Sequence, residues 1–302
     1  MLLVFPVSSV DAHLALQVAE WMRTLGPYGR HKALLVWSSE LPPEKRAPIV
    51  DHFKAMDWQE PPRALTVTIK DHEQTWPTAA NVIFRETAKM IAAVPELRCP
   101  WYFFEPDCTP MHARWMDVLA DLYNQDLSKP FLGCVQDTFN VVGNERIKVG
   151  EHLVGTAIYP PVLEQFTRLH LRPSFAFDHA ISQDIMPHVR DTKLIQHNWS
   201  TGRYHLCPFS GRSGKPLQIR CSKVTLRFTQ TGQAIDHEVR IGAMVLHGCK
   251  DGTLIECLKL RQKIACPEGS EVLKTLGESP FLSKRLNKCQ KRRAKRLQAQ
   301  VP

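Results

Sequence analysis

The sequence has no apolar run that approaches the ~18 residues needed to cross a bilayer. It therefore predicts no membrane-spanning helix. Its nine cysteines include no C-x-x-C pair, which excludes the usual zinc ribbons and favours reduced thiols over a disulfide framework, as in cytoplasmic proteins. The opening "MLLVFPVSSVD" has no basic residue before its short apolar run, so we interpret it as a first strand rather than a signal peptide. We find no internal repeat and no low-complexity tract.

Positive charge is concentrated near the C-terminus. The 302 residues carry a formal net charge of +9, and residues 284–296 contain eight Lys and Arg residues and no acid. Subtracting eight from nine leaves about +1 for the rest of the chain. Electrostatic attraction to a polyanion is therefore expected from this segment and not from the body of the protein.

Strand-like and helix-like segments alternate through the first two hundred residues. The strand-like runs are residues 2–8, 31–39, 64–70, 100–106 and 130–136. Helical patterns lie between them, from Asp11 to about Leu25, from Thr78 to Ala93, and over residues 111–125. This alternation predicts an α/β fold with a three-layer, mostly parallel sheet.

The regular alternation fades after residue 137. We expect a hairpin around "VGNER", a helix near residues 161–169 and a further strand in "VRDTKLIQHNW". Residues 201–246 are rich in Gly, Ser, Arg and Thr and are expected to form loops and antiparallel strands. Residues 282–298 indicate a basic helix.

The aromatic run of residues 100–104 is followed by two carboxylates, Glu105 and Asp107, which are separated by Pro106. An ionised Glu105 or Asp107 at the end of a buried strand is costly unless a positive partner offsets its desolvation. A divalent cation such as Mg²⁺ or Mn²⁺ would do so and would leave positions open for phosphate oxygens. The alternative is a turn motif in which Asp107 and Thr109 cap a helix that begins near Met111.

Five motifs in order resemble those of GT-A-fold glycosyltransferases of phages and bacteria. They are "WPTAANVIF" (76–84), "PWYFFEPDCTPMHARWMDVL" (100–119), "GEHLVGTAIYP" (150–160), "DTKLIQHNW" (191–199) and "LHGCKDGTLI" (246–255). The resemblance covers most of residues 1–260, with residues 201–246 as an irregular insertion that has possible acceptor contacts. Residues 261–302 then form a basic C-terminal helical tail outside the GT-A-like domain.

The resemblance implies transfer of a sugar from a nucleotide-diphosphate sugar, UDP-linked by preference, with Mn²⁺ or Mg²⁺. Asp107 would bind the metal directly, and Glu105 would contact a metal-bound water or the ribose; Glu105 departs from the first acid of the family's D-x-D. A late histidine would complete the metal site, with His247 preferred over His197, and Lys250 would meet the diphosphate. Either histidine could instead be a core-edge residue bonded to backbone.

The same resemblance suggests residues for the donor and the acceptor. Donor contacts are expected from Pro6, Ser8, Ser9, Trp76, Asn81 and Arg85. Trp76 could also be a core residue, and Arg85 a solvated helix residue. An inverting mechanism needs a base, for which Asp178 is the first candidate and Asp184 the second, although Asp178 could instead cap a helix. A retaining mechanism needs no such base, so the stereochemistry is open.

Basic residues outside the donor motifs suggest a polyanionic acceptor. The predicted nucleic-acid contacts are Arg212, Lys215, Arg220, Lys284, Arg285, Lys288, Arg292 and Arg293. The preferred hypothesis is a phage-type enzyme, acting in the host cytoplasm, that glycosylates a 5-hydroxymethylpyrimidine in double-stranded DNA after the base leaves the stack. The alternatives are a glycosyltransferase for a surface glycan or lipid, without stable membrane insertion, and a nucleic-acid-binding protein with a defunct donor site. The tail could also serve solubility or packaging.

Overall fold

The computed structural model describes residues 1–142, 145–169, 171, 175–197, 223–230, 233–240 and 242–265. The chain divides into two compact units, Met1–Glu256 and Cys257–Pro302. The second unit lies almost entirely outside the described residues, so the fold below is that of the first. Among the described residues, every helix is too short or too polar to cross a membrane.

A seven-stranded sheet forms the centre of the first unit, with the strand order β3-β2-β1-β4-β7-β6-β8. Its strands are β1 (Leu2–Val7), β2 (Lys32–Ser38), β3 (Arg63–Val67), β4 (Trp101–Phe103), β6 (Phe131–Val142), β7 (Glu145–Tyr159) and β8 (Val189–Asp191). β7 runs antiparallel to both of its neighbours, and the other six strands share one direction. The prediction of a mostly parallel α/β sheet is confirmed.

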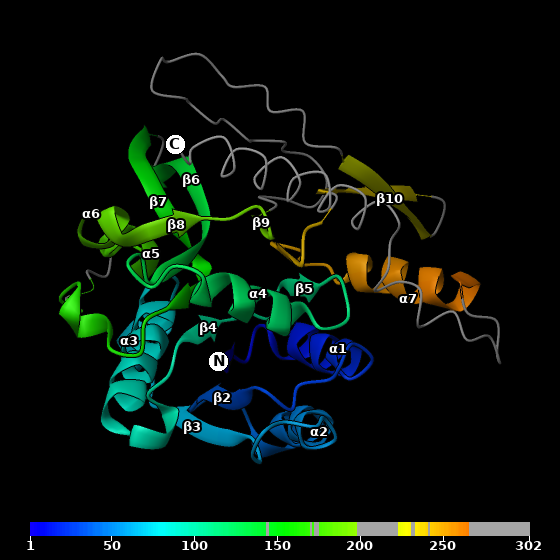
Figure 1. Ribbon diagram of the computed structural model, residues 1–302, viewed down its shortest axis with the longest axis horizontal. Coiled ribbons are helices and arrows are strands. Elements are labelled where there is room, and N and C mark those ends of the chain that lie inside the picture. The colour runs from blue at the N-terminus through cyan, green and yellow to red at the C-terminus, as the bar shows by residue number, and fades with distance from the viewer. Residues whose placement is uncertain are drawn as a thin grey trace, which may run out of the picture. The chain divides into compact units, whose positions relative to one another are not determined.

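Helices cover both faces of this sheet (Figure 1). They are α1 (Ala12–Met22), α2 (Pro43–Lys54), α3 (Thr78–Ala93), α4 (Trp115–Asn124), α5 (Phe177–Ala180) and α6 (Ser182–Ile185). Every residue of β1 is buried, because alternate side chains enter different layers. Leu2 and Val4 pack in one core with α3, α5 and α6, whereas Phe5 packs on Phe53 of α2. This is a three-layer arrangement.

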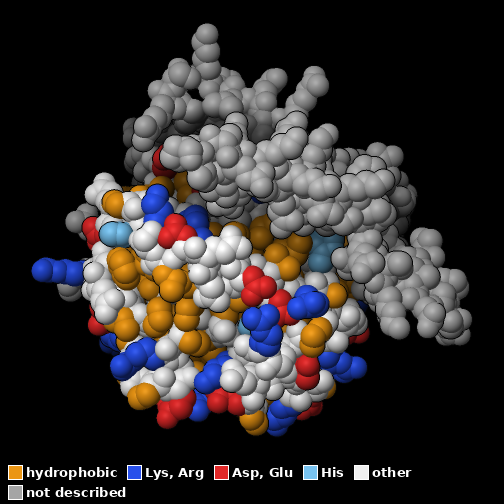
Figure 2. All heavy atoms as spheres, viewed as in Figure 1, with side chains coloured by type: hydrophobic (Ala, Val, Ile, Leu, Met, Phe, Trp, Pro, Cys, Tyr) orange, Lys and Arg blue, Asp and Glu red, His pale blue; other side chains and the backbone are white. Residues whose placement is uncertain are grey.

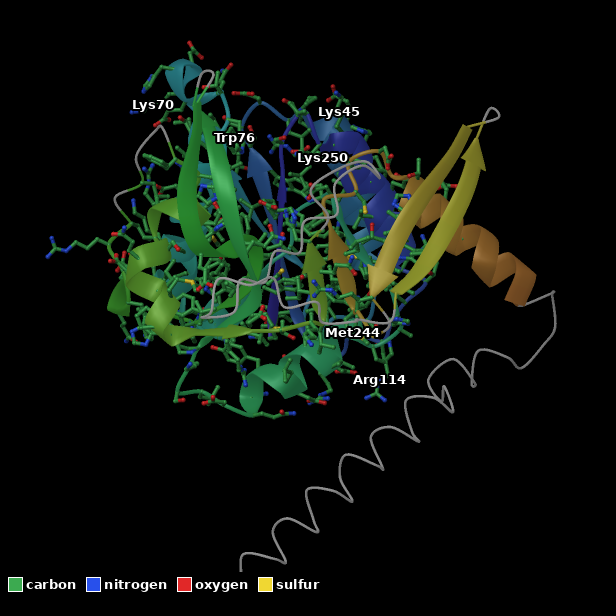
Figure 3. All side chains as sticks on the ribbon, turned by 90° about the horizontal axis from the view of Figure 1, so that it is seen from above. Lys45, Lys70, Trp76, Arg114, Met244 and Lys250 are labelled. Atoms are coloured by element: carbon green, nitrogen blue, oxygen red, sulfur yellow. The ribbon has the colours of Figure 1, made fainter. Side chains whose placement is uncertain are left out.

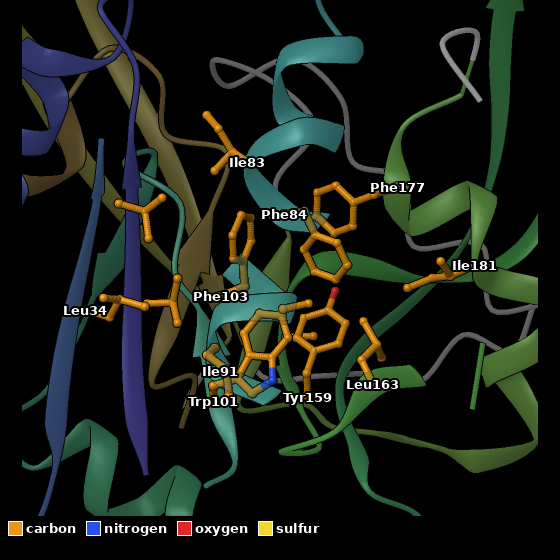
Figure 4. Packing of buried hydrophobic residues seen from close by; sticks show 14 of the residues in the cluster. Leu34, Ile83, Phe84, Ile91, Trp101, Phe103, Tyr159, Leu163, Phe177 and Ile181 are labelled. Atoms are coloured by element: carbon orange, nitrogen blue, oxygen red, sulfur yellow. The ribbon is translucent and has the colours of Figure 1, made fainter. Parts of the chain in front are cut away.

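Aromatic rings fill the core between the sheet and α3 (Figure 4). The Phe84 ring of α3 stacks on Phe177 of α5 with a centroid separation of 3.9 Å. Trp101 of β4 stacks on Tyr159 of β7 at 4.7 Å, and Phe84 meets Tyr159 edge-on. These contacts fix α5 against the sheet, and α5 carries Asp178, one of the predicted site residues.

The close approach of α5 to β7 depends on Gly155. A Cβ atom at this position would lie 2.7 Å from Cζ of Phe177. We therefore expect Gly155→Ala to lower the free energy of unfolding by about 1–3 kcal/mol through overpacking. Chemical denaturation would measure the change, with the exposed Gly29→Ala as control, where the nearest atom would be 3.4 Å away. Equal stability of the two variants would contradict this packing.

Three short strands form a second sheet with the order β5-β12-β9. They are β5 (Cys108–Pro110), β12 (Val245–His247) and β9 (Ile195–His197). A separate antiparallel hairpin joins β10 (Lys223–Gln230) to β11 (Gln233–Arg240), and α7 (Thr253–Ala265) follows β12. Four 3-10 turns complete the described elements: η1 (Asp71–Glu73), η2 (Pro95–Leu97), η3 (Leu163–Gln165) and η4 (Met186–His188).

Three local expectations differ from the structure. The helix expected from Met111 begins at Trp115, because Arg114 adopts a left-handed backbone conformation with φ 59° and residues 108–110 pair as β5. The helix expected over residues 161–169 is reduced to the turn η3. The single strand expected in residues 189–199 is divided into β8 and β9, which belong to different sheets.

Candidate metal centre at the carboxyl end of β4

The carboxyl ends of β1 and β4 meet at one edge of the main sheet. The two strands run parallel, with Val4 opposite Phe103, so the chain leaves both strands at the same edge. Phe104 is still fully buried and extends the ladder by donating its amide to the Val4 carbonyl. Glu105 and Asp107 follow at once, at the edge where open α/β sheets bind their ligands.

The second sheet brings His247 to the same edge. In β12, His247 lies opposite Cys108 of β5 and beside His197 of β9. Gly248 follows with φ 94°, a left-handed conformation that suits glycine. The resulting turn lets the amides of Gly248 and Cys249 both donate to the Asp107 carbonyl, at 3.1 and 3.0 Å. The backbone thus fixes Asp107 against the end of β12.

Both predicted carboxylates contact the same imidazole nitrogen. The Nε2 atom of His247 lies 2.8 Å from Oε2 of Glu105 and 3.1 Å from Oδ1 of Asp107. Thr156 of β7 donates its hydroxyl to the same Glu105 oxygen at 3.2 Å. The His197 ring packs edge-on against His247 with a centroid separation of 4.5 Å. The structure therefore brings together all four residues that the sequence predicted as metal ligands.

The electrostatics of this cluster are strongly polarised. Burial opposes a negative charge on Asp107, but His247 outweighs burial and, with a smaller contribution from Lys250, lowers the pKa of Asp107. Burial also opposes protonation of His247, yet Asp107 and Glu105 raise the pKa of His247 to about 10. Burial, with repulsion from His247, lowers the pKa of His197 well below its usual value. One shared proton thus bridges His247 and the two carboxylates.

The donor atoms fit a hard divalent cation. Adjacent ligands of an octahedral ion with bonds of about 2.1 Å lie about 3 Å apart, close to the observed N···O separations of 2.8 and 3.1 Å. Carboxylate and imidazole groups suit Mn²⁺ or Mg²⁺. The Cys108 thiol is within 4.8 Å of the ligand atoms of Asp107 and His247, but sulfur is a soft ligand that Mn²⁺ and Mg²⁺ do not prefer. In the metal-free protein, burial raises the pKa of this thiol well above its usual value. Asp107, Glu105 and His247 would hold such an ion.

Four of the remaining residues predicted near the donor lie on the loops that follow β1, precede α3 and follow β12. Ser8 and Ser9 are half-buried after β1, and the Ser8 hydroxyl donates to Asp11 at 2.8 Å. Pro6 is buried within β1. Trp76, whose side chain is 73% exposed, precedes α3, and Lys250 is exposed after β12 (Figure 3). An exposed indole is available for stacking, so the alternative of a core Trp76 is wrong.

Two predicted donor residues on α3 are engaged within the fold. Asn81 is 3% exposed and donates its amide to the Phe175 carbonyl at 2.8 Å, which ties α3 to the segment before α5. Arg85 is half-buried and pairs with Glu86 at 2.8 Å. Their contact with a donor stays a prediction.

The two predicted base candidates have different surroundings. Asp178 is half-buried and accepts hydrogen bonds from the amides of Gly155 and His179, at 3.2 and 2.9 Å. Asp184 accepts the Thr167 hydroxyl at 2.6 Å. Gly155 and Thr156 were not predicted as site residues, although the Gly155 amide donates to Asp178 and the Thr156 hydroxyl donates to Glu105. Only their position in the motif "LVGTAIYP" could have suggested them.

All the predicted nucleic-acid contacts lie outside the described residues. These are Arg212, Lys215, Arg220, Lys284, Arg285, Lys288, Arg292 and Arg293. On the face of the described residues shown in Figure 2, Lys and Arg side chains are interspersed with Asp and Glu. This agrees with the near-neutral charge expected for the body of the protein.

No protein-family model matches the chain, and no curated protein sequence is detectably similar to it. Solved structures with some likeness include the galactosyltransferase LgtC in complex with donor and acceptor sugar analogues. It is 11% identical with a TM-score of 0.49, covering 92% of this chain and 99% of LgtC. The structure of an active-site mutant of LgtC is 8% identical with a TM-score of 0.48, covering 90% of this chain and 98% of the LgtC chain. Mouse xyloside xylosyltransferase 1 gives 8% identity and a TM-score of 0.41, covering 65% of this chain and 87% of that one.

A cation and the shared proton should compete for His247. Because the Nε2 proton stands where a metal–nitrogen bond would form, each bound ion must release it. We expect the apparent Mn²⁺ affinity to rise about tenfold per pH unit between about pH 6.5 and 8.5, the slope for one released proton. Titration of free Mn²⁺ by electron paramagnetic resonance would measure it. An unchanged slope in His247→Asn would show that this proton is not the one displaced.

Proposed function

We propose that the chain is a metal-dependent glycosyltransferase of the GT-A type, transferring a sugar from a nucleotide-diphosphate sugar to a hydroxyl group. The observation that carries this proposal is the convergence of Asp107, Glu105 and His247 at the carboxyl edge of a mostly parallel sheet. In such sheets this edge is where nucleotide ligands bind. UDP is the nucleotide we favour, from the family resemblance of the five sequence motifs.

The residues around the cluster supply binding and orientation. Asp107 and Glu105 would hold the cation through hard oxygen ligands, and His247 would complete the set. When bound, a divalent ion there would supply neutralisation of the charge on the pyrophosphate leaving group. Lys250, exposed after β12, adds positive charge beside the same phosphates. Ser8, Ser9 and the exposed Trp76 are proposed to hold the nucleoside.

Asp178 is the proposed base on the acceptor side. Its half-buried carboxylate is held by the amides of Gly155 and His179, which orient both oxygens without neutralising the charge. In an inverting reaction it would take the proton of the attacking hydroxyl. Asp184, the second candidate, is exposed and accepts the Thr167 hydroxyl at 2.6 Å.

The acceptor we propose is the hydroxymethyl group of a 5-hydroxymethylpyrimidine in phage DNA. The distribution of charge supports this acceptor, because the body of the protein is nearly neutral and eight cations lie within residues 284–296. A segment of this kind neutralises several phosphates, so its binding to DNA should weaken steeply with salt. The same cluster would also attract anionic headgroups, which is why a surface glycan or lipid is the second candidate acceptor.

The test is a matched set of acceptor assays with Mn²⁺ and a panel of nucleotide sugars. Hydroxymethylated DNA, unmodified DNA and lipid-linked glycan are compared, and the products are identified by mass. A sugar-sized mass gain confined to hydroxymethylated nucleosides supports the DNA proposal. Transfer only to the glycan favours the second candidate. If the protein binds none of the nucleotide sugars in the presence of metal, the result would favour the third candidate, a nucleic-acid-binding protein with a defunct donor site.

A further inference from the structure

A second group of metal-binding side chains lies where α5 meets β7. His152 belongs to β7 and is 2% exposed, while Asp178 and His179 lie in α5 and are half-buried. One ligand atom from each residue lies within 4.8 Å of the other two. The residues come from segments more than twenty positions apart, so the group is built by the fold and not by a local turn.

An irregularity in the sheet creates this meeting point. The pairing of β6 with β7 shifts between Gly133 and Val135, whose partners are Ala157 and Leu153. Two additional β7 residues are therefore accommodated at the shift, as in a β-bulge, which bends a strand and redirects its side chains. Gly155 lies in this stretch and donates its amide to Asp178 at 3.2 Å. The shift thus holds the Asp178 carboxylate beside the strand that carries His152.

The two imidazoles do not face each other as a linear hydrogen bond requires. Their Nε2 atoms are 3.2 Å apart, and the ring centroids are 4.2 Å apart with the planes at 79°. A linear N–H···N bond of this length along both ring axes would separate the centroids by about 5.5 Å. The ring axes are therefore inclined to the line that joins the two nitrogens, and one linear hydrogen bond does not account for their close approach.

The separation of the nitrogens matches two ligands of one ion. Bonds of about 2.05 Å at a tetrahedral angle place the nitrogens about 3.3 Å apart, against the observed 3.2 Å. Asp178 supplies a hard oxygen nearby. Each of its two oxygens accepts one amide hydrogen bond, and a carboxylate oxygen has a second lone pair that can bind an ion. Among the described residues, Nδ1 of His179 is buried without a hydrogen-bond partner, so the contacts of this ring are made through Nε2.

We propose that His152, Asp178 and His179 bind one transition cation of the Zn²⁺ or Co²⁺ type, at a site separate from that of Asp107. Two imidazoles and one carboxylate suit a borderline ion, whereas the two carboxylates and single imidazole at Asp107 suit Mn²⁺ or Mg²⁺. Three protein ligands leave a fourth position open to water or another ligand. If Asp178 is also the acceptor-side base, an ion at this site lowers turnover, a consequence that rests on the proposed function.

The number of bound Zn²⁺ ions tests the site without any activity assay. The full chain, freed of metal by chelation, is dialysed against low-micromolar Zn²⁺, and wild type is compared with His179→Asn and with the control His13→Asn. His13 is exposed on α1. We expect wild type and the control to retain one more equivalent than His179→Asn, and Asp107→Asn to retain this equivalent. Equal numbers in wild type and His179→Asn would overturn the proposal.

Folding and ligand identity are checked independently. His179 and Asp178 are half-buried, so His179→Asn and Asp178→Asn are safer variants than a change at the buried His152, and circular dichroism verifies their fold. Co²⁺ bound to Asp107→Asn should show the visible absorption of a four-coordinate ion, and X-ray absorption should show two imidazole ligands. A spectrum of octahedral Co²⁺ with oxygen ligands alone would contradict the assignment.

Discussion

Replacing Asp107 by asparagine should lower the rate of sugar transfer by about three orders of magnitude. The carboxamide keeps the shape of the side chain and the backbone bonds from Gly248 and Cys249 but loses the charge that holds the cation. Charge neutralisation by a bound metal contributes several kcal/mol to the transition state. About 1.4 kcal/mol corresponds to a tenfold change in rate, so a loss of about 4 kcal/mol lowers the rate about a thousandfold. The decrease is expected in kcat/KM.

The measurement is release of nucleoside diphosphate from the donor identified by the acceptor assays. The matched control is Asp121→Asn, because Asp121 is an exposed carboxylate on α4 that pairs only loosely with Arg30 at 3.4 Å. The control should retain wild-type turnover. Turnover of Asp107→Asn within tenfold of wild type would show that this carboxylate does not support the reaction.

Replacing His247 by alanine should destabilise the metal-free protein and weaken metal binding together. His247 is 6% exposed, and its Nε2 is the shared partner of Glu105 and Asp107. Its removal leaves two carboxylates near each other without a cation. Breaking a buried charge pair in this way costs about 3–5 kcal/mol in the free energy of unfolding.

The destabilisation should depend on pH with a definite sign. The pKa of His247 is raised in the fold to about 10, so its stabilising contribution is complete below the ordinary histidine pKa of about 6.5. The contribution is lost as the pH rises toward 10, at up to about 1.4 kcal/mol per pH unit. Urea denaturation in the presence of chelator measures the free energy of unfolding of wild type and of His247→Ala. The difference between the two proteins should be smaller at pH 9.5 than at pH 6.5.

A difference of the same size at both pH values would exclude a shared proton as the source of stabilisation. The control is His13→Ala on the exposed side of α1. It should match wild type at both pH values, because its imidazole is solvated in the folded and unfolded chain alike.

The strand–helix alternation and the two carboxylates of the E-P-D segment could be recognised from local sequence, whereas His247 and His197 were suggested only by the family resemblance. Buried parallel strands are continuous apolar runs, and amphipathic helices such as α3, predicted and found over Thr78–Ala93, have a clear period. The E-P-D segment stood out because two charges follow an aromatic strand. A strand end is a local feature, and its position at the ligand-binding edge follows from the parallel order of the sheet.

Long-range pairing could not be predicted in the same way. Cys108 and His247 lie opposite each other across β5 and β12, although their sequence positions are remote. Three-residue strands carry too little pattern to reveal their partners. The sequence also contains no pattern that predicts the register shift near Gly155. The contact between His152 and His179 could therefore not be predicted either. Arg114, which directly precedes α4, has a left-handed backbone conformation that few residues other than glycine adopt. The later start of this helix could therefore not be predicted.

We propose that Asp107 and His247 place a divalent cation against the pyrophosphate of a nucleotide. The most direct measurement is the ³¹P nuclear magnetic resonance spectrum of UDP titrated with substoichiometric Mn²⁺ in the presence of the protein. We expect wild type to enhance the paramagnetic broadening of both phosphate signals beyond that in free solution, and Asp107→Asn to abolish the enhancement. Broadening that is the same with wild type, with Asp107→Asn and without protein would contradict the account.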